Sequence, residues 1–184
     1  MDAVPTGQLV MTDYSIVLKS WKKIFEPDCG TLRDILAPEA TANDWQSLLD
    51  YLSTNHKIQY SEDGTICSLP PFETIGQRRE KVSVALSIQM GGYTINSYFF
   101  IPGEIEMDLL PDEINSENKA KSVFDFLSSI ARVLDKEVFL TGEGVNGNVA
   151  QLRNAAVLFV NSAGQFSLRP EFANGQEPTT ETAL

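Results

Sequence analysis

Apolar and polar residues alternate along residues 82–109, and this pattern constrains the fold more than any other feature of the chain. Alternation of period two indicates β-strands with one buried face and one face in water. The pattern is interrupted at Gly91-Gly92 and at Pro102-Gly103, which are turn sequences. It therefore predicts three strands joined by short turns, which is an antiparallel meander.

The segment before residue 56 is predicted to be helical. Apolar residues at spacings of three and four predict one helix over residues 10–25, capped by Thr12. A short helix is expected over residues 32–36. Thr41 is expected to cap a third helix that carries Trp45 and further apolar residues on one face.

Strands and one long helix are predicted for the remainder of the chain. Asp63-Gly64 separates two strand-like runs and predicts a hairpin. The other predicted elements are a loop over residues 70–81, a helix over 116–134, a strand over 137–141 and a hairpin over 156–169. These elements indicate the α+β class, in which an antiparallel sheet of meander and hairpins packs against helices.

The predicted elements form a single domain over residues 1–170. Its N-terminal part, residues 1–55, is expected to be helical, and residues 56–170 are expected to hold the sheet and the long helix. Residues 171–184 lose the apolar pattern and are expected to form a flexible tail.

The charge balance restricts the partners that the protein can have. The chain of 184 residues carries 14 basic and 25 acidic residues, a net charge of −11. Nucleic-acid backbones and anionic membrane surfaces both attract Lys and Arg, so neither is the expected partner. The sequence contains no run of about 18 apolar residues. Residues 1–5 lack the pattern of a secretory signal, so we expect a cytoplasmic protein.

Two cysteines, Cys29 and Cys67, lie far apart in the sequence, and neither belongs to a C-x-x-C pair. This spacing does not favour a zinc site or redox chemistry of the thioredoxin type. Two reduced thiols are expected in a cytoplasmic protein. A disulfide between the two remains open as the alternative.

Residues 142–147, GEGVNG, match the G-x-G-x-x-G pattern of dinucleotide-binding loops. In such sites the glycines let the backbone approach a pyrophosphate next to a parallel sheet. The strands around this segment are predicted to be antiparallel, so we expect a turn rich in Gly and Asn. A small-ligand or nucleotide site at this loop is the alternative.

The sequence has none of the common catalytic or metal-binding patterns. There is no G-x-S-x-G elbow, no H-E-x-x-H, no Cys/His cluster and no calcium loop. The single histidine, His56, is expected near the end of the third helix, where a positive charge would favour the helix dipole. We therefore expect a non-enzymatic protein with no catalytic residue, no cofactor and no metal.

Acidic residues gather where basic ones are missing. No Lys or Arg occurs from residue 82 to residue 118, and Glu104, Glu106 and Asp108 share one face of the third meander strand. An ordinary solvent face or the protection of an edge strand would explain such a stripe. It would also steer a basic protein partner. The candidate partner-binding residues are Glu104, Glu106, Asp108, Asp112 and Glu113.

Two segments resemble known protein families. Residues 123–143, VFDFLSSIARVLDKEVFLTGE, with the hairpin after them, resemble the end of bacterial immunity proteins that neutralise a toxin. Residues 48–52, LLDYL, and 58–69, IQYSEDGTICSL, resemble the first helix and hairpin of type III secretion chaperones. Both resemblances imply a non-enzymatic protein that binds another protein.

The expected function is therefore binding of a more basic protein, as an immunity-type inhibitor of a bacterial toxin or as a secretion-type chaperone for an effector. A third interpretation is a homo-oligomer, such as a homodimer, in which exposed aromatic residues such as Tyr98 and Phe100 pair across a two-fold axis.

Overall fold

The computed structural model describes residues 9–26 and 31–173, and these segments form an α+β fold built on one antiparallel sheet. Within them the sheet has ten strands in the order β1-β10-β9-β8-β2-β7-β6-β5-β3-β4. The strands are β1 (Val10–Thr12), β2 (Arg33–Pro38), β3 (Lys57–Glu62), β4 (Thr65–Cys67), β5 (Val84–Gln89), β6 (Thr94–Ser97), β7 (Glu104–Leu109), β8 (Val138–Gly142), β9 (Leu158–Val160) and β10 (Phe166–Leu168).

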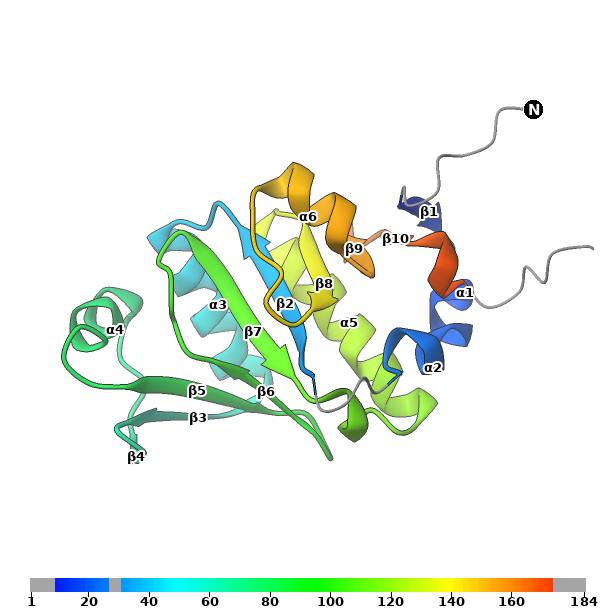
Figure 1. The fold of residues 1–184 in the computed structure, drawn as a ribbon. Coiled ribbons are helices and arrows are strands. Elements are labelled where there is room, and N and C mark those ends of the chain that lie inside the picture. Colours follow the sequence, from blue (N-terminus) through cyan, green and yellow to red (C-terminus); the bar gives the residue numbers. More distant parts are fainter. Residues whose placement is uncertain (1–8, 27–30, 174–184) are drawn as a thin grey trace, which may run out of the picture.

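Helices cover the two faces of the sheet unequally (Figure 1). The long helices α3 and α5 contact each other and lie behind the sheet in this view, whereas α6 lies on the opposite face and contacts β8. No described helix lies in front of β7 in Figure 1. The helices are α1 (Tyr14–Lys19), α2 (Trp21–Ile24), α3 (Ala42–Asn55), α4 (Phe72–Arg78), α5 (Glu117–Leu134) and α6 (Val149–Ala155), with 3-10 turns η1 (Pro111–Glu113) and η2 (Pro170–Phe172).

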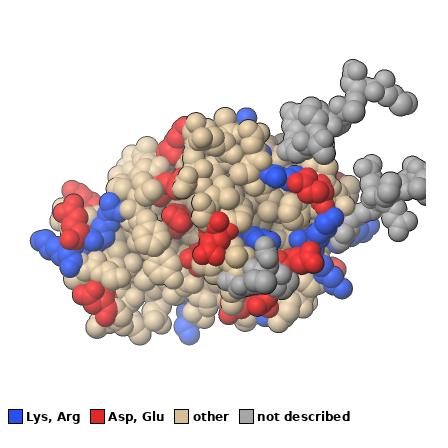
Figure 2. Space-filling view, viewed as in Figure 1, with Lys and Arg blue, Asp and Glu red and all other residues tan. Residues whose placement is uncertain are grey.

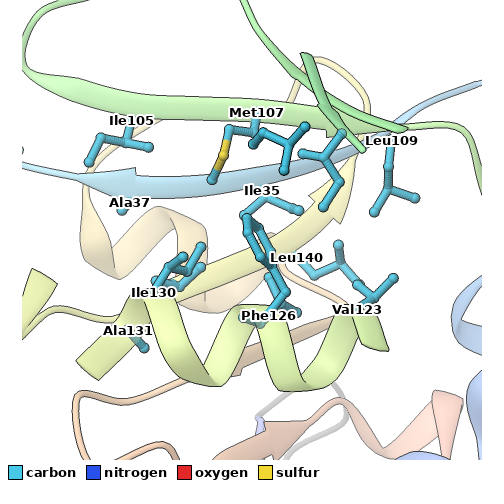
Figure 3. Close-up of a cluster of buried hydrophobic side chains, with 14 of the residues drawn as sticks. Ile35, Ala37, Ile105, Met107, Leu109, Val123, Phe126, Ile130, Ala131 and Leu140 are labelled. Carbon is cyan, nitrogen blue, oxygen red and sulfur yellow. The ribbon is translucent and has the colours of Figure 1, made fainter. Parts of the chain in front are cut away.

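The main core lies between the sheet and α5 (Figure 3). Ile105, Met107 and Leu109 of β7 point toward Val123 and Phe126 of α5, and each of the five is at most 2% exposed. Full burial of one such side chain contributes roughly 1.5–3 kcal/mol to folding. Because the apolar side chains of β7 enter the core, its alternating polar side chains face the other side of the sheet.

Several predicted elements are confirmed. The meander is present as β5, β6 and β7, and the first hairpin is β3-β4, with Asp63 and Gly64 both at positive φ in the turn. Thr41 caps α3 through a reciprocal capping box with Asp44. Ser116 caps α5, which runs over the predicted range, and the last hairpin is β9-β10. Caps and periodicity are local signals, which explains their success.

The prediction of one helix over residues 10–25 was wrong. Val10 to Thr12 form the edge strand β1, Asp13 rather than Thr12 caps α1, and the helix is interrupted at Ser20. The Ser20 hydroxyl donates to the Ile16 carbonyl, a local hydrogen bond that competes with helix geometry.

The predicted helix over residues 32–36 was also wrong, because this segment is the central strand β2. β2 lies between β7 and β8, and all six of its residues are buried. A strand covered on both faces shows no alternation, so its apolar run looks like part of a helical stripe.

The predicted loop over residues 70–81 contains the short helix α4. Only Phe72 and Ile75 of this helix are buried, too few for a periodic pattern. The Phe72 ring stacks on Trp45 of α3 with centroids 5.1 Å apart.

Some predictions fall partly outside the described residues. Cys29 and residues 174–184 of the expected tail lie there. Cys67 is described, is partly buried and carries a free thiol. None of the described helices is long and apolar enough to cross a membrane.

Candidate protein-binding face

The acidic residues of β7 are positioned by the strand itself. Because its apolar residues enter the core, Glu104, Glu106 and Asp108 point to the opposite face, where each is partly exposed. Figure 2 shows acidic side chains in the middle of this face. β7 is an interior strand between β2 and β6, so protection of an edge does not explain these charges.

Asp34 of β2 extends this stripe. In the β2-β7 register Asp34 lies directly opposite Asp108, which places the two carboxylates on the same face of the sheet. Asp34 is only 5% exposed, and its carboxylate accepts a hydrogen bond from the Gly144 amide at 2.8 Å. Its neighbour Arg33 is directed elsewhere, where its guanidinium donates to the Ile24 carbonyl at 3.2 Å.

The loop after β8 brings one more carboxylate to this place. Glu143 is exposed and accepts a hydrogen bond from the Leu32 amide at 3.0 Å. Its charge is close enough to Asp34 and Asp108 to raise the pKa of both. We call Asp34, Glu104, Glu106, Asp108 and Glu143 the acidic face.

Polar side chains continue this face across the meander. Asn96 of β6 lies opposite Asp108, and its amide donates to the Asp108 carboxylate at 3.3 Å. The Asn96 side-chain oxygen in turn accepts from the Ser87 hydroxyl of β5 at 3.0 Å. These contacts hold Asp108 in one orientation.

Four carboxylates of the acidic face have a raised pKa, and burial is the main cause for each of them. Burial raises the pKa of Asp34 to about 6, against the effect of the Gly144 hydrogen bond, and the charges of Glu106, Asp108 and Glu143 add to the rise. Burial and the charges of its two β7 neighbours raise the pKa of Glu106. Burial also raises the pKa of Glu104 and of Asp108. The surroundings of these four carboxylates therefore disfavour their charged forms.

No Lys or Arg neutralises the acidic face within the described residues. The ion pairs found there involve other acids, namely Glu62, Asp125, Asp44, Glu137 and Glu171. Like charges on directly opposite residues are destabilising by tenths of a kcal/mol up to about 1 kcal/mol. The face thus carries an electrostatic cost that the fold itself does not require.

The other two candidate residues lie elsewhere. Asp112 and Glu113 are in η1, the turn between β7 and α5, beyond the end of the strand. Asp112 is exposed, whereas the Glu113 carboxylate accepts a hydrogen bond from the Thr94 amide at 3.1 Å. Sequence reasoning missed Asp34 and Glu143, although an aspartate inside the apolar run of residues 32–37 was a signal for the former.

In the glycine loop, residues 142–147, and at the start of the helix after it, backbone amides already form hydrogen bonds within the protein. As the dinucleotide pattern requires, the loop follows a strand and precedes a helix, α6. However, the Gly144 amide donates a hydrogen bond to the Asp34 carboxylate. The first turn of α6 is capped by reciprocal hydrogen bonds between Asn148 and Gln151. The sheet is antiparallel, and Glu143 adds negative charge. These features do not favour a phosphate.

His56 caps the C-terminal end of α3, as expected, but it is not suited to carry charge. Its ring lies edge-on to Tyr51 and Phe126, and its buried Nε2 atom has no hydrogen-bond partner among the described residues. Burial lowers the pKa of His56, which favours the neutral form. The described residues contain no cluster of His, Cys, Asp and Glu that could hold a metal ion.

Comparisons with protein-family models, with curated proteins and with solved structures give no match.

Proposed function

We propose that this protein binds a more basic protein through the acidic face and acts as a stoichiometric, non-enzymatic inhibitor of the immunity type. One observation carries the proposal: the carboxylates on β2, β7 and the loop after β8 have no compensating cation among the described residues. Basic side chains of a partner would supply it.

The position of the carboxylates suits a folded partner. Interior strands position Asp34, Glu106 and Asp108 in one array, and the hydrogen bonds from Gly144 and Asn96 limit the movement of Asp34 and Asp108. A prearranged array loses little conformational entropy on binding. Such a face also steers a basic partner during encounter and raises the association rate at low salt.

A chaperone of the secretion type is the second candidate. The segment that resembles those proteins forms α3 and the β3-β4 hairpin. The two candidates differ in the state of the partner, because an inhibitor binds a folded toxin, whereas a chaperone binds an effector in an unfolded or extended form.

The test compares two charge variants. The acidic-face variant, Glu104→Gln/Glu106→Gln/Asp108→Asn, removes three charges from β7. The helix-face variant, Asp50→Asn/Glu73→Gln/Glu117→Gln, removes the same number from exposed positions on α3, α4 and α5. Both variants therefore have the same net charge.

Each protein would be used to capture partners from cells that make it, and the captured protein would be purified and titrated. We expect a basic protein that binds wild type and the helix-face variant in a 1:1 complex, and the acidic-face variant at least about tenfold more weakly. Equal binding by both variants would exclude the acidic face. Loss of the partner's activity in the complex distinguishes an inhibitor from a chaperone.

A further inference from the structure

An exposed aromatic pair lies at the end of β6, beside the acidic face. Tyr98 and Phe100 are 40% and 61% exposed, and their rings stack with centroids 5.4 Å apart and an interplanar angle of 26°. Ile101, which follows, is 53% exposed. Three large apolar side chains in water within four residues are costly, and such patches commonly mark binding sites.

The backbone of this segment is held in a strained form. Phe99 has φ of 56°, a left-handed conformation that is unfavourable for a bulky residue. The Phe99 ring is buried against Trp45, with centroids 5.0 Å apart. The Arg79 guanidinium donates to the carbonyls of Phe99 and Phe100. These contacts bury Phe99 and leave the rings on either side of it exposed.

The pair belongs to the same surface as the carboxylates. Tyr98 is two residues beyond Asn96, so strand alternation places it on the side of Asp108. Burial and the charge of Asp108 raise the pKa of Tyr98, which places the two groups within electrostatic reach. A cavity of about 380 Å³ beside the pair is lined by both rings together with Arg79 and Glu80.

We propose that Tyr98 and Phe100 form an arginine-binding site at the margin of the acidic face, where a guanidinium of the basic partner stacks on the exposed rings next to Asp108. This inference rests on the proposed function and specifies the partner's chemistry. A guanidinium is planar and weakly hydrated, so it stacks on an aromatic ring while its N–H edge binds a carboxylate. A lysine ammonium is more strongly hydrated and lacks that planar geometry.

Charge also argues against a second copy of the chain on this surface. A two-fold interface would place the same patch of both subunits together, and Asp108 would then face a like-charged neighbour. A basic partner is attracted by the same charges. The aromatic pair would supply the desolvated anchor that such an interface needs, because aromatic side chains dominate binding energy at hot spots.

The test uses capped hexa-arginine and hexa-lysine peptides, which carry equal charge, titrated calorimetrically at low salt. The variant Tyr98→Leu/Phe100→Leu keeps apolar side chains at both exposed positions but removes the rings. We expect wild type to bind hexa-arginine about tenfold more tightly than hexa-lysine. The leucine variant should lose this preference while its affinity for hexa-lysine stays unchanged.

Other outcomes overturn the inference. An equal arginine preference in wild type and in the leucine variant would exclude the rings as the site, and so would a dimer of wild type that the leucine variant abolishes. The acidic-face and helix-face variants test the proposed function separately. If both peptides bind the acidic-face variant as tightly as the helix-face variant, the acidic face fails, whether or not the arginine preference is present.

Discussion

Asp34 of β2 lies directly opposite Asp108 of β7, so two carboxylates meet on neighbouring interior strands of the sheet. The amide of Gly144 donates to the first and the side chain of Asn96 donates to the second. Each carboxylate has one donor within the described hydrogen bonds, and the fold tolerates their repulsion. We therefore expect the protonation of this pair to change both the folding stability and the binding of a partner with pH.

Asp34→Asn should stabilise the protein at neutral pH. The pKa of Asp34 is raised from 3.8 to about 6 in the folded protein, so its contribution to stability is complete below about pH 4 and is lost as the pH rises through 6. Asparagine removes this loss, and its side-chain oxygen can still accept from Gly144. The free energy of unfolding should rise on the order of 2 kcal/mol near pH 7.

Urea denaturation of wild type and Asp34→Asn at about pH 4 and about pH 7 checks this effect. The two proteins should differ little at the lower pH. Asp50→Asn, on the exposed face of α3, controls for the loss of one negative charge. A smaller free energy of unfolding for Asp34→Asn at neutral pH would contradict the prediction.

The acidic-face variant should bind the basic partner with a weaker dependence on salt. Close charge pairs across an interface contribute roughly 1.5 kcal/mol or more each, and charges near its rim act mainly on the association rate. The raised pKa values of Glu104, Glu106 and Asp108 also predict that wild-type binding weakens as the pH falls and these groups become neutral. Stopped-flow association at several ionic strengths, repeated at lower pH, measures both effects. An association rate of the wild-type protein that does not depend on salt would contradict this mechanism.

Sequence periodicity predicts those parts of the fold whose determinants are local. The alternation of β7 and the cap of α5 by Ser116 both follow from neighbouring residues. β2 is different, because its buried apolar run is defined as a strand by its pairing with β7 and β8 and not by neighbouring residues in the sequence. A helix of about two turns such as α4 has too few buried residues for its period to be recognised.

The same distinction applies to the candidate site. The period-two spacing of Glu104, Glu106 and Asp108 predicts that they share a face, and the structure confirms it. Asp34 and Glu143 come from segments far away in the chain, and only the strand order brings them to Asp108. A linear sequence contains no signal for that pairing, since strand neighbours are set by tertiary packing.

Gly144→Ala should destabilise the loop that covers Asp34. Gly144 has φ of 74°, and an alanine there costs about 1 kcal/mol even though its added Cβ would meet no atom within 4 Å. Gly142→Ala is the matched control, because its Cβ also enters open space and its φ is not positive. Urea denaturation should show a loss of about 1 kcal/mol for the first variant and within about 0.5 kcal/mol for the second. Equal free energies of unfolding for the two variants would show that the loop does not require glycine at position 144.

Arg79→Met should remove the arginine preference without altering either ring of the aromatic pair. Arg79 donates to the carbonyls of Phe99 and Phe100, and its loss removes these hydrogen bonds, which help to hold the left-handed Phe99. We expect a loss of about 1–2 kcal/mol in the free energy of unfolding. The ratio of hexa-arginine to hexa-lysine affinity should fall toward one, because Tyr98 and Phe100 no longer keep a fixed stack.

Arg78→Met is the control for this change, since it removes the same charge from the adjacent residue. Arg78 forms an ion pair with Glu62 at the surface, and such pairs contribute little to stability. The control variant should keep the arginine preference of wild type. If Arg79→Met kept it as well, Arg79 would not position the aromatic pair, and the rings would hold their arrangement through the burial of Phe99 against Trp45 alone.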